Sequence, residues 1–259
     1  MKLIDPTTLA GWLMPHSLEW YKQLSVQEGK YVYPWNSTHT EPNGESIFDR
    51  EVTNMIPGKK VLDVGCGHGG FTLQCSEIAN EIVGFDVTDR FVQEGSSSKK
   101  SNVTFVRGNS KERLPFKEDE FDCAYIRKGP TSAYSDLKRV VKESGVILGL
   151  HPGDESSMEL PFLFPNLFQV TKDTPILDTI HERMVNSEFA NKSLEKINSI
   201  EYINSPIDIL KLCCFGQHPS ILEIIKEKNL PEVTRIFEKN ASEKGLAITF
   251  SRYLIRVKV

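Results

Sequence analysis

One pattern recurs between residues 59 and 151: a short apolar run rich in β-branched residues, then a segment with helical spacing of its apolar positions. This alternation is typical of a parallel sheet whose strands are joined by helices. The expected strands are 59–64, 81–86, 102–108, 121–127 and 145–151. The expected helices between them include 71–79 and 131–144. This part of the chain is therefore predicted to form an α/β domain with five parallel strands.

Beyond the fifth expected strand the regular alternation stops. Helical spacing predicts a helix over 176–189, and residues 219–241 look like two helices separated by Pro231. Apolar positions three apart over 193–204 favour a helix, but β-branched content and chain order assign at least the second half to a sixth strand. Near-alternation over 245–259 predicts an antiparallel strand close to the sheet edge. The expected fold is a three-layer α/β sandwich with a mostly parallel seven-stranded sheet and an antiparallel C-terminal strand.

Charge and cysteine content bear on the class of protein. With a net charge of −4, the chain gives no support to a large nucleic-acid-binding face. Its five cysteines show no C-x-x-C spacing, so neither a metal site nor a disulfide framework is expected. A reducing cytoplasm fits this cysteine usage best. No stretch approaches the roughly 20 apolar residues of a membrane span, and the N-terminus lacks an apolar run of signal-peptide length.

The first expected strand runs into a glycine loop, VLDVGCGHGG, that fits two cofactor patterns. Gly65, Gly67 and Gly70 satisfy the dinucleotide pattern G-x-G-x-x-G. Gly65, Gly67 and Gly69, preceded by Asp63, satisfy the D-x-G-x-G-x-G pattern of a methyl-donor site. Asp63 separates the two, because a carboxylate there would repel a pyrophosphate but suits the ammonium and sulfonium of S-adenosylmethionine.

The next strand ends in a second acid, Asp86, which is placed to accept hydrogen bonds from ribose hydroxyls of either cofactor. Three segments resemble motifs of the class I S-adenosylmethionine-dependent methyltransferases. The glycine loop resembles the family's first motif and reads VLDVGCGHGG, and the next strand resembles the family's second-strand acid and reads IVGFDVTDRF. The third segment resembles the run before the family's fourth strand and reads GNSKERLPFKEDEFDCAYIR. The resemblance covers residues 58 to about 151. It implies a Rossmann-like fold and S-adenosylmethionine as the cofactor, and it leaves the substrate open.

The resemblance also implies roles for single residues at the ends of the expected strands. Cofactor contacts are expected from Asp63, Gly65, Cys66, Gly67, Gly69, Asp86, Val87, Asn109, Ser110 and Tyr125. The loop residues would line the methionine end, and Asp86 with Val87 would hold the ribose and adenine. Asn109 stands where the family usually has an aspartate, so its adenine contact competes with an ordinary Asx turn. Simpler alternatives are a plain tight turn for the glycine loop and a capping role for Asp63.

Three residues are candidates for catalysis: His151, Arg127 and Tyr125. Methyl transfer from an activated donor needs mainly alignment, and a general base only when the acceptor carries a proton. Arg127 and Lys128 would grip an anionic group on the acceptor, unless Arg127 pairs with a local acid. His151, oriented by Asp154, would be the base, unless it is a plain loop histidine.

The resemblance implies a single domain in four parts. These are an N-terminal cap over 1–50, a cofactor-binding core over 51–151, a sixth-strand and helical substrate side over 152–244, and the last strand over 245–259. The expected function is methyl transfer from S-adenosylmethionine to a small organic molecule, with no metal. The alternatives are an RNA or protein methyltransferase, a nicotinamide-dependent oxidoreductase with a Rossmann fold, and a module that binds cofactor without catalysis. The segment IRKGP after the fourth strand lacks the Asn/Asp-Pro-Pro-Tyr/Phe motif typical of base-amine methylation, which favours the small-molecule acceptor.

Overall fold

The structure is a computed structural model that describes residues 2–189 and 191–259, and the chain divides into two compact units. The first unit contains the described residues of Met1–Glu41, Glu155–Asp173 and Asn198–Ser251. The second contains those of Pro42–Asp154, Thr174–Ile197 and Arg252–Val259. Two long strands, β7 (Asn191–Ile203) and β8 (Leu246–Lys258), contribute residues to both units.

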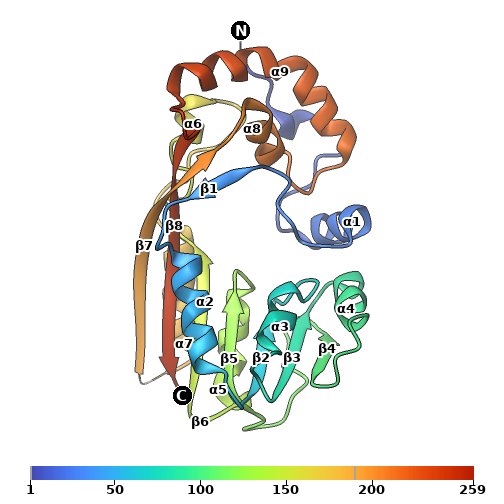
Figure 1. Ribbon diagram of the computed structural model, residues 1–259, viewed down its shortest axis with the longest axis vertical. Helices are drawn as coiled ribbons and strands as arrows, with labels where there is room; N and C mark the ends of the chain where they lie inside the picture. Colours follow the sequence, from blue (N-terminus) through green and yellow to red (C-terminus); the bar gives the residue numbers. More distant parts are fainter. Residues whose placement is uncertain (1, 190) are drawn as a thin grey trace. The chain divides into compact units, whose positions relative to one another are not determined.

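Five parallel strands form the centre of the second unit (Figure 1). They are β2 (Lys60–Val64), β3 (Glu81–Asp86), β4 (Val103–Arg107), β5 (Phe121–Arg127) and β6 (Val141–Pro152). The order of the described strands is β1-β7-β8-β6-β5-β2-β3-β4, with β8 antiparallel to β6. Strands β3 and β4 lie on one side of β2, and β5 and β6 on the other. The strand order therefore reverses at the end of β2, the position where open α/β sheets bind ligands.

Helices cover both faces of this parallel sheet, which confirms the predicted three layers (Figure 1). Helices α2 (Gly44–Met55) and α3 (Gly70–Cys75) pack with one set of alternate strand residues, including Val61, Cys123 and Leu148. Helices α5 (Tyr134–Val140) and α7 (Pro175–Asn186) pack with the other set, including Leu62, Ala124 and Ile147. Helix α4 (Asp89–Ser96) packs against β3 and β4. The two-residue period of the strands thus assigns each apolar side chain to one helical layer.

The first unit has a separate apolar core, which includes Leu3, Ile209, Ile225 and Leu246. Its elements are η1 (Pro6–Thr8), α1 (Leu18–Glu28), β1 (Ser37–His39), α6 (Leu160–Leu163), α8 (Pro206–Cys213) and α9 (Pro219–Asn240), with β1 antiparallel to the end of β7. Two side-chain amides hold the N-terminal segment to this core. Asn229 bonds the backbone N–H and C=O of Ile4, and Gln217 does the same for Leu13.

Helix α9 corrects the prediction of two helices, because it continues unbroken through Pro231. One face of the helix is buried at every fourth residue, at Ile221, Ile225, Asn229, Val233 and Phe237. The burial of this stripe on both sides of the proline outweighs the loss of one backbone hydrogen bond.

Two strand predictions are also corrected. Strand β8 is antiparallel as predicted, but it lies inside the sheet between β6 and β7 rather than near the edge. Strand β1 was not predicted, because three residues are too few to show a period. It brings the number of described strands in the sheet to eight, instead of the predicted seven.

The predicted helix over 131–144 ends at Val140, and the rest of that segment extends β6. Strand β7 takes up nearly all of 193–204, as its β-branched content indicates.

Candidate cofactor site

The glycine loop joins β2 to α3 at the carboxyl end of the parallel strands. Gly65, Gly67 and Gly69 have φ of 77°, 56° and 82°, a region that side chains with a Cβ rarely adopt. The N–H groups of Gly65 and Cys66 donate to the Phe85 carbonyl of β3, at 2.7 and 3.2 Å. The loop conformation therefore depends on its glycines and is tied to the neighbouring strand.

Two neighbouring segments, the turn that follows β5 and strand β4, pack closely against this loop. A Cβ at Gly65 would lie 2.6 Å from Pro130 Cδ and 2.8 Å from Gly129 Cα, in the turn that follows β5. A Cβ at Gly69 would overlap the ring of Phe105, which β4 supplies. The sequence pattern did not single out Phe105, because a phenylalanine within an apolar strand carries no signal of its own. Its ring lies against the backbone that forms the loop.

Asp63 lies beneath the loop, only 2% exposed. Its Oδ2 accepts hydrogen bonds from Thr72 Oγ1 at 2.7 Å and from the Tyr125 hydroxyl at 2.9 Å. Asp63 and Tyr125 are direct neighbours across β2 and β5. Burial raises the pKa of Asp63 to about 7, although the two hydrogen bonds oppose this shift. A carboxyl that titrates near neutrality is well placed to become charged when a cation approaches it.

Asp86 closes the other side of the loop at the end of β3. Its Oδ2 accepts from the Gly67 N–H at 2.9 Å, and its Oδ1 accepts from the Thr88 N–H at 2.8 Å. Burial raises the pKa of Asp86, and the backbone hydrogen bonds oppose the rise. Asp86 and its neighbour Val87 both remain partly exposed. The carboxylate therefore shapes the loop, and part of the residue's surface stays accessible.

The structure brings the remaining sequence-predicted cofactor residues to the same end of the sheet. Asn109 forms the Asx turn that the alternative interpretation predicted, with its Oδ1 accepting from the Lys111 N–H at 3.1 Å. Ser110 pairs its hydroxyl with that of Ser132 at 2.7 Å. Cys66 points its Sγ at the Gly67 carbonyl, 3.5 Å away, and burial raises the pKa of its thiol. Among the described residues, no group of three or more His, Cys, Asp or Glu side chains is arranged to hold a metal.

Arg127 pairs with acids of α2, as the simpler alternative for this residue predicted. Its Nε and Nη2 donate to the two oxygens of Asp49 at 2.8 and 2.9 Å, and Nη2 also reaches Glu45 at 3.2 Å. Its guanidinium carbon lies 5.0 Å from the centroid of the Phe71 ring, at the start of α3. The guanidinium is therefore fixed between α2 and the helix that follows the glycine loop.

The carboxylate of Glu45 forms ion pairs with three cationic side chains. Lys128 Nζ lies 3.2 Å and Arg252 Nη2 2.8 Å from its carboxylate, in addition to Arg127. Burial alone would raise the pKa of Glu45, but the positive charges of Lys128, Arg252 and Arg127 outweigh it and hold the pKa at about 2. Glu45 and Asp49 precede the predicted core strands, and no motif in the sequence connects them with Arg127.

His151 and Tyr125 are buried rather than open to a substrate. Burial lowers the pKa of His151 to about 4, so the imidazole is neutral at physiological pH. Its Nε2 lies 2.9 Å from the Tyr134 hydroxyl. The expectation that Asp154 orients His151 is wrong. The Asp154 carboxylate instead accepts from the first backbone N–H groups of α7, at residues 176 and 177, and from the Tyr253 hydroxyl.

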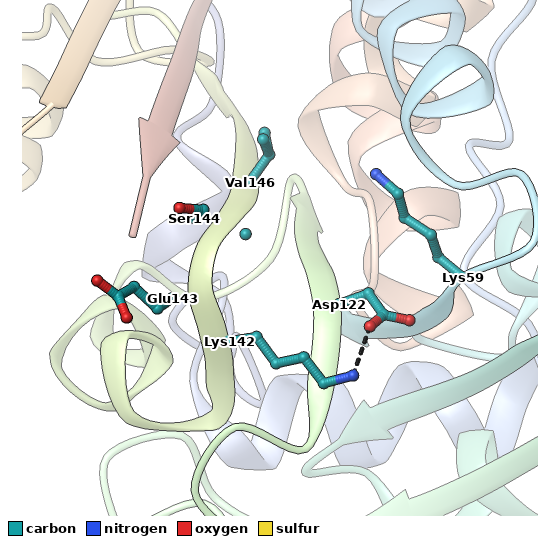
Figure 2. Close-up of a pocket in the computed structure, with 7 residues that line it drawn as sticks. Lys59, Asp122, Lys142, Glu143, Ser144 and Val146 are labelled. Atoms are coloured by element: carbon teal, nitrogen blue, oxygen red, sulfur yellow. Dashed lines mark hydrogen bonds and ion pairs between the residues drawn. The ribbon is translucent and has the colours of Figure 1, made fainter.

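A shallow hollow lies at the opposite end of the parallel strands (Figure 2). It is lined by Lys59, Asp122, Lys142, Glu143, Ser144, Gly145 and Val146. Lys142 reaches across it to Asp122, with Nζ 2.7 Å from Oδ1 (Figure 2). Ligands of parallel α/β sheets bind at the carboxyl ends of the strands, so this hollow is not the cofactor site.

The parallel sheet, the glycine loop at its switch point and the acids beside that loop define a Rossmann-like domain that binds a nucleoside cofactor. Residues 61–148 match the family model of the methyltransferase domain. These residues therefore carry a class I S-adenosylmethionine-dependent methyltransferase domain, a family whose methyl donor is S-adenosylmethionine. This assignment does not favour the alternative of a nicotinamide-dependent oxidoreductase with a Rossmann fold.

Curated relatives agree with this family, and a solved structure shares the fold. The chain is 29% identical over 175 residues to a ubiquinone/menaquinone biosynthesis C-methyltransferase of Shewanella oneidensis, a match that covers 54% of this chain and 69% of the relative. It is 31% identical over 144 residues to a sterol 24-C-methyltransferase of Gibberella zeae, over 45% of this chain and 37% of the relative. A protein of unknown function from Deinococcus radiodurans shares the fold, with a TM-score of 0.59 and 16% identity over 92% of this chain and 96% of that one.

Among the described residues, no helix is both long and apolar enough to cross a membrane.

Proposed function

We propose that the protein transfers a methyl group from S-adenosylmethionine to a small organic molecule. The observation that carries the proposal is Asp63, a buried carboxyl with a pKa of about 7 directly below a glycine loop. A cofactor with a positive charge at its methionine end offers such a group a partner, which a pyrophosphate does not. By their names, the relatives reported above are a C-methyltransferase of ubiquinone/menaquinone biosynthesis and a sterol 24-C-methyltransferase, which supports a small-molecule acceptor.

The residues of the loop fit the cofactor in distinct ways. The glycine backbone leaves room for close approach of a ligand, and Asp86 offers carboxylate oxygens for ribose hydroxyls. Val87 would pack on the adenine, and the amide nitrogen of Asn109 would donate to it, since its oxygen serves the Asx turn. We assign Tyr125 to holding Asp63, because its hydroxyl bonds that carboxyl and its side chain is fully buried.

The charges near the site do not single out an anionic acceptor. Arg127 and Lys128 already bind carboxylates of α2, so an anion on the acceptor would compete with Asp49 and Glu45 for them. We therefore propose a neutral or weakly acidic acceptor. The five free cysteines support a reducing compartment such as the cytoplasm.

Titration calorimetry tests the cofactor directly. S-adenosylmethionine and S-adenosylhomocysteine are expected to bind with one-to-one stoichiometry, and NADH is expected not to bind. A radiolabelled methyl group should then transfer to one member of a panel of phenols, quinols and unsaturated lipids. Tight NADH binding without a response to S-adenosylhomocysteine would overturn the proposal, and salt-sensitive labelling of RNA would replace the small acceptor by a nucleic acid.

Asp86→Ala is expected to weaken S-adenosylhomocysteine binding by about 10- to 100-fold, because it removes the ribose acceptor and the anchor of the Gly67 N–H. Asp89→Ala is a matched control. It removes the same charge three residues away, from a side chain that is 57% exposed, and should leave binding unchanged. Equal effects of the two substitutions would show that overall charge, rather than the position of Asp86, determines affinity.

A further inference from the structure

Tyr134 and His151 form a buried polar pair on the face of β6 covered by α5. His151 is 2% exposed and Tyr134 fully buried. The absence of a side chain at Gly149 provides the space that the pair occupies. Gly149 lies two residues before His151 on the same strand face, and a Cβ at Gly149 would overlap the Tyr134 hydroxyl. A glycine inside a strand weakens it, so the chain gives up strand stability to keep this pair together.

The pair connects to the turn that follows β5. Nε2 of His151 faces the Tyr134 hydroxyl at 2.9 Å, which leaves the other ring nitrogen for the hydrogen bond that the imidazole makes with the backbone of Gly129. The preceding residue, Lys128, donates its backbone N–H to the Leu150 carbonyl of β6 at 2.7 Å. Two successive residues of the turn are thus held by β6.

This turn needs to be held, because its backbone is unusual and its packing is close. Lys128 has a φ of 62°, which is disfavoured for a residue with a side chain. A Cβ at Gly129 would lie 2.5 Å from the Val64 carbonyl oxygen and 3.2 Å from Gly65 Cα. The turn therefore lies directly against the first glycine of the cofactor loop.

We propose that Tyr134 and His151 are positioning residues that hold the turn of residues 128–130 against Gly65 and so fix the methionine end of the cofactor site. The inference rests on the proposed function and deepens it. In this role His151 does not exchange a proton with the acceptor. Burial keeps the imidazole neutral, and both ring nitrogens are engaged within the protein.

Paired substitutions separate the two hydrogen bonds of His151. Asparagine places its amide nitrogen where Nδ1 stands, so His151→Asn keeps the link to Gly129. Glutamine places its amide near Nε2, so His151→Gln keeps the link to Tyr134 alone. We expect His151→Gln to weaken S-adenosylhomocysteine binding by about 10-fold and His151→Asn to retain more of the affinity. In both variants the KM for the acceptor and the pH profile of kcat should stay as in the wild type.

Tyr134→Phe and Tyr253→Phe form a matched pair. Each removes one buried hydroxyl from the second unit. The hydroxyl of Tyr253, however, donates to Asp154, the residue whose carboxylate accepts from the first N–H groups of α7. Tyr134→Phe should weaken S-adenosylhomocysteine binding by several fold, and Tyr253→Phe should lower thermal stability alone. Equal binding by both variants overturns the inference, and so does loss of one limb of the kcat pH profile in His151→Asn, which would make His151 a base. Failure of the wild type to bind S-adenosylhomocysteine would instead overturn the proposed function.

Discussion

Asp63→Asn is expected to stabilise the cofactor-free protein at pH 8 and to remove most of its affinity for S-adenosylmethionine. Burial raises the pKa of Asp63 from 3.8 to about 7, so folding at pH 8 keeps an ionised carboxylate out of water. A shift of this size corresponds to about 4 kcal/mol of unfavourable free energy. Asparagine keeps an oxygen for Thr72 and Tyr125, and after the cost of burying its own NH₂ group we expect a net gain of about 2 kcal/mol in urea unfolding.

The same substitution should reveal the pH dependence of stability that arises from His151, which Asp63 masks in the wild type. The raised pKa of Asp63 contributes stability that is full below pH 3.8 and is lost as pH rises through about 7. The pKa of His151 is lowered from 6.5 to about 4, so its contribution is full above pH 6.5 and is lost as pH falls toward 4. Between pH 4 and 6.5 the two contributions oppose each other in the wild type. In Asp63→Asn, stability should therefore fall by about 3 kcal/mol as the pH is lowered from 6.5 to 4.

Urea unfolding of the variant at several pH values, with Asp89→Asn as an exposed control, checks both statements. A variant that is less stable than the wild type at pH 8, or one with an unchanged pH dependence, would contradict the assignment of a buried, titrating Asp63. Calorimetry on the same samples separates stability from function. The cofactor's positive charge should favour the ionised carboxylate, so wild-type affinity should rise between pH 6 and 8, and the variant should lose this dependence.

The sequence predicts those parts of the fold that depend on local pattern. Strands β2 to β6 and the antiparallel β8 follow from apolar runs and alternation, and Asp63 and Asp86 follow from their positions at strand ends. The single helix α9 could not be predicted, because Pro231 is a local signal against helix and only the packed stripe on both sides of it overrides that signal. Local propensity therefore fails here where burial decides.

The chemistry of the site was less predictable than its backbone. Asp63 could be chosen from sequence, but its partner Thr72, and the burial that brings its pKa to about 7, appear only once α3 packs on the sheet. For Arg127 the sequence leaves open an anionic group of the acceptor or an acid of the protein, and it does not name the acid, Asp49, which lies far away in the chain. Pairing between distant residues depends on tertiary structure, which a single sequence does not specify.

Gly65→Ala is expected to reduce S-adenosylhomocysteine affinity by a factor on the order of 100. Two costs combine at this position. The φ of 77° is unfavourable by about 1–2 kcal/mol for a residue with a Cβ. The new methyl group would also lie 2.6 Å from Pro130 Cδ and 2.8 Å from Gly129 Cα. The turn is bonded to β6 through Lys128 and cannot withdraw easily, so the glycine loop itself must move.

Gly58→Ala separates these two costs. Gly58 has a similar φ of 70°, but a Cβ there would meet nothing within 4 Å. It should therefore show the backbone cost alone, about 1 kcal/mol in urea unfolding, with unchanged cofactor affinity. Gly65→Ala should lose about 3 kcal/mol of stability, since overpacking adds to the backbone cost. If the two variants bound S-adenosylhomocysteine equally well, the approach of the turn to Gly65 would have no part in cofactor binding. A loss confined to Gly65→Ala would show that contact between the turn and the loop, beyond the glycine conformation itself, shapes the site.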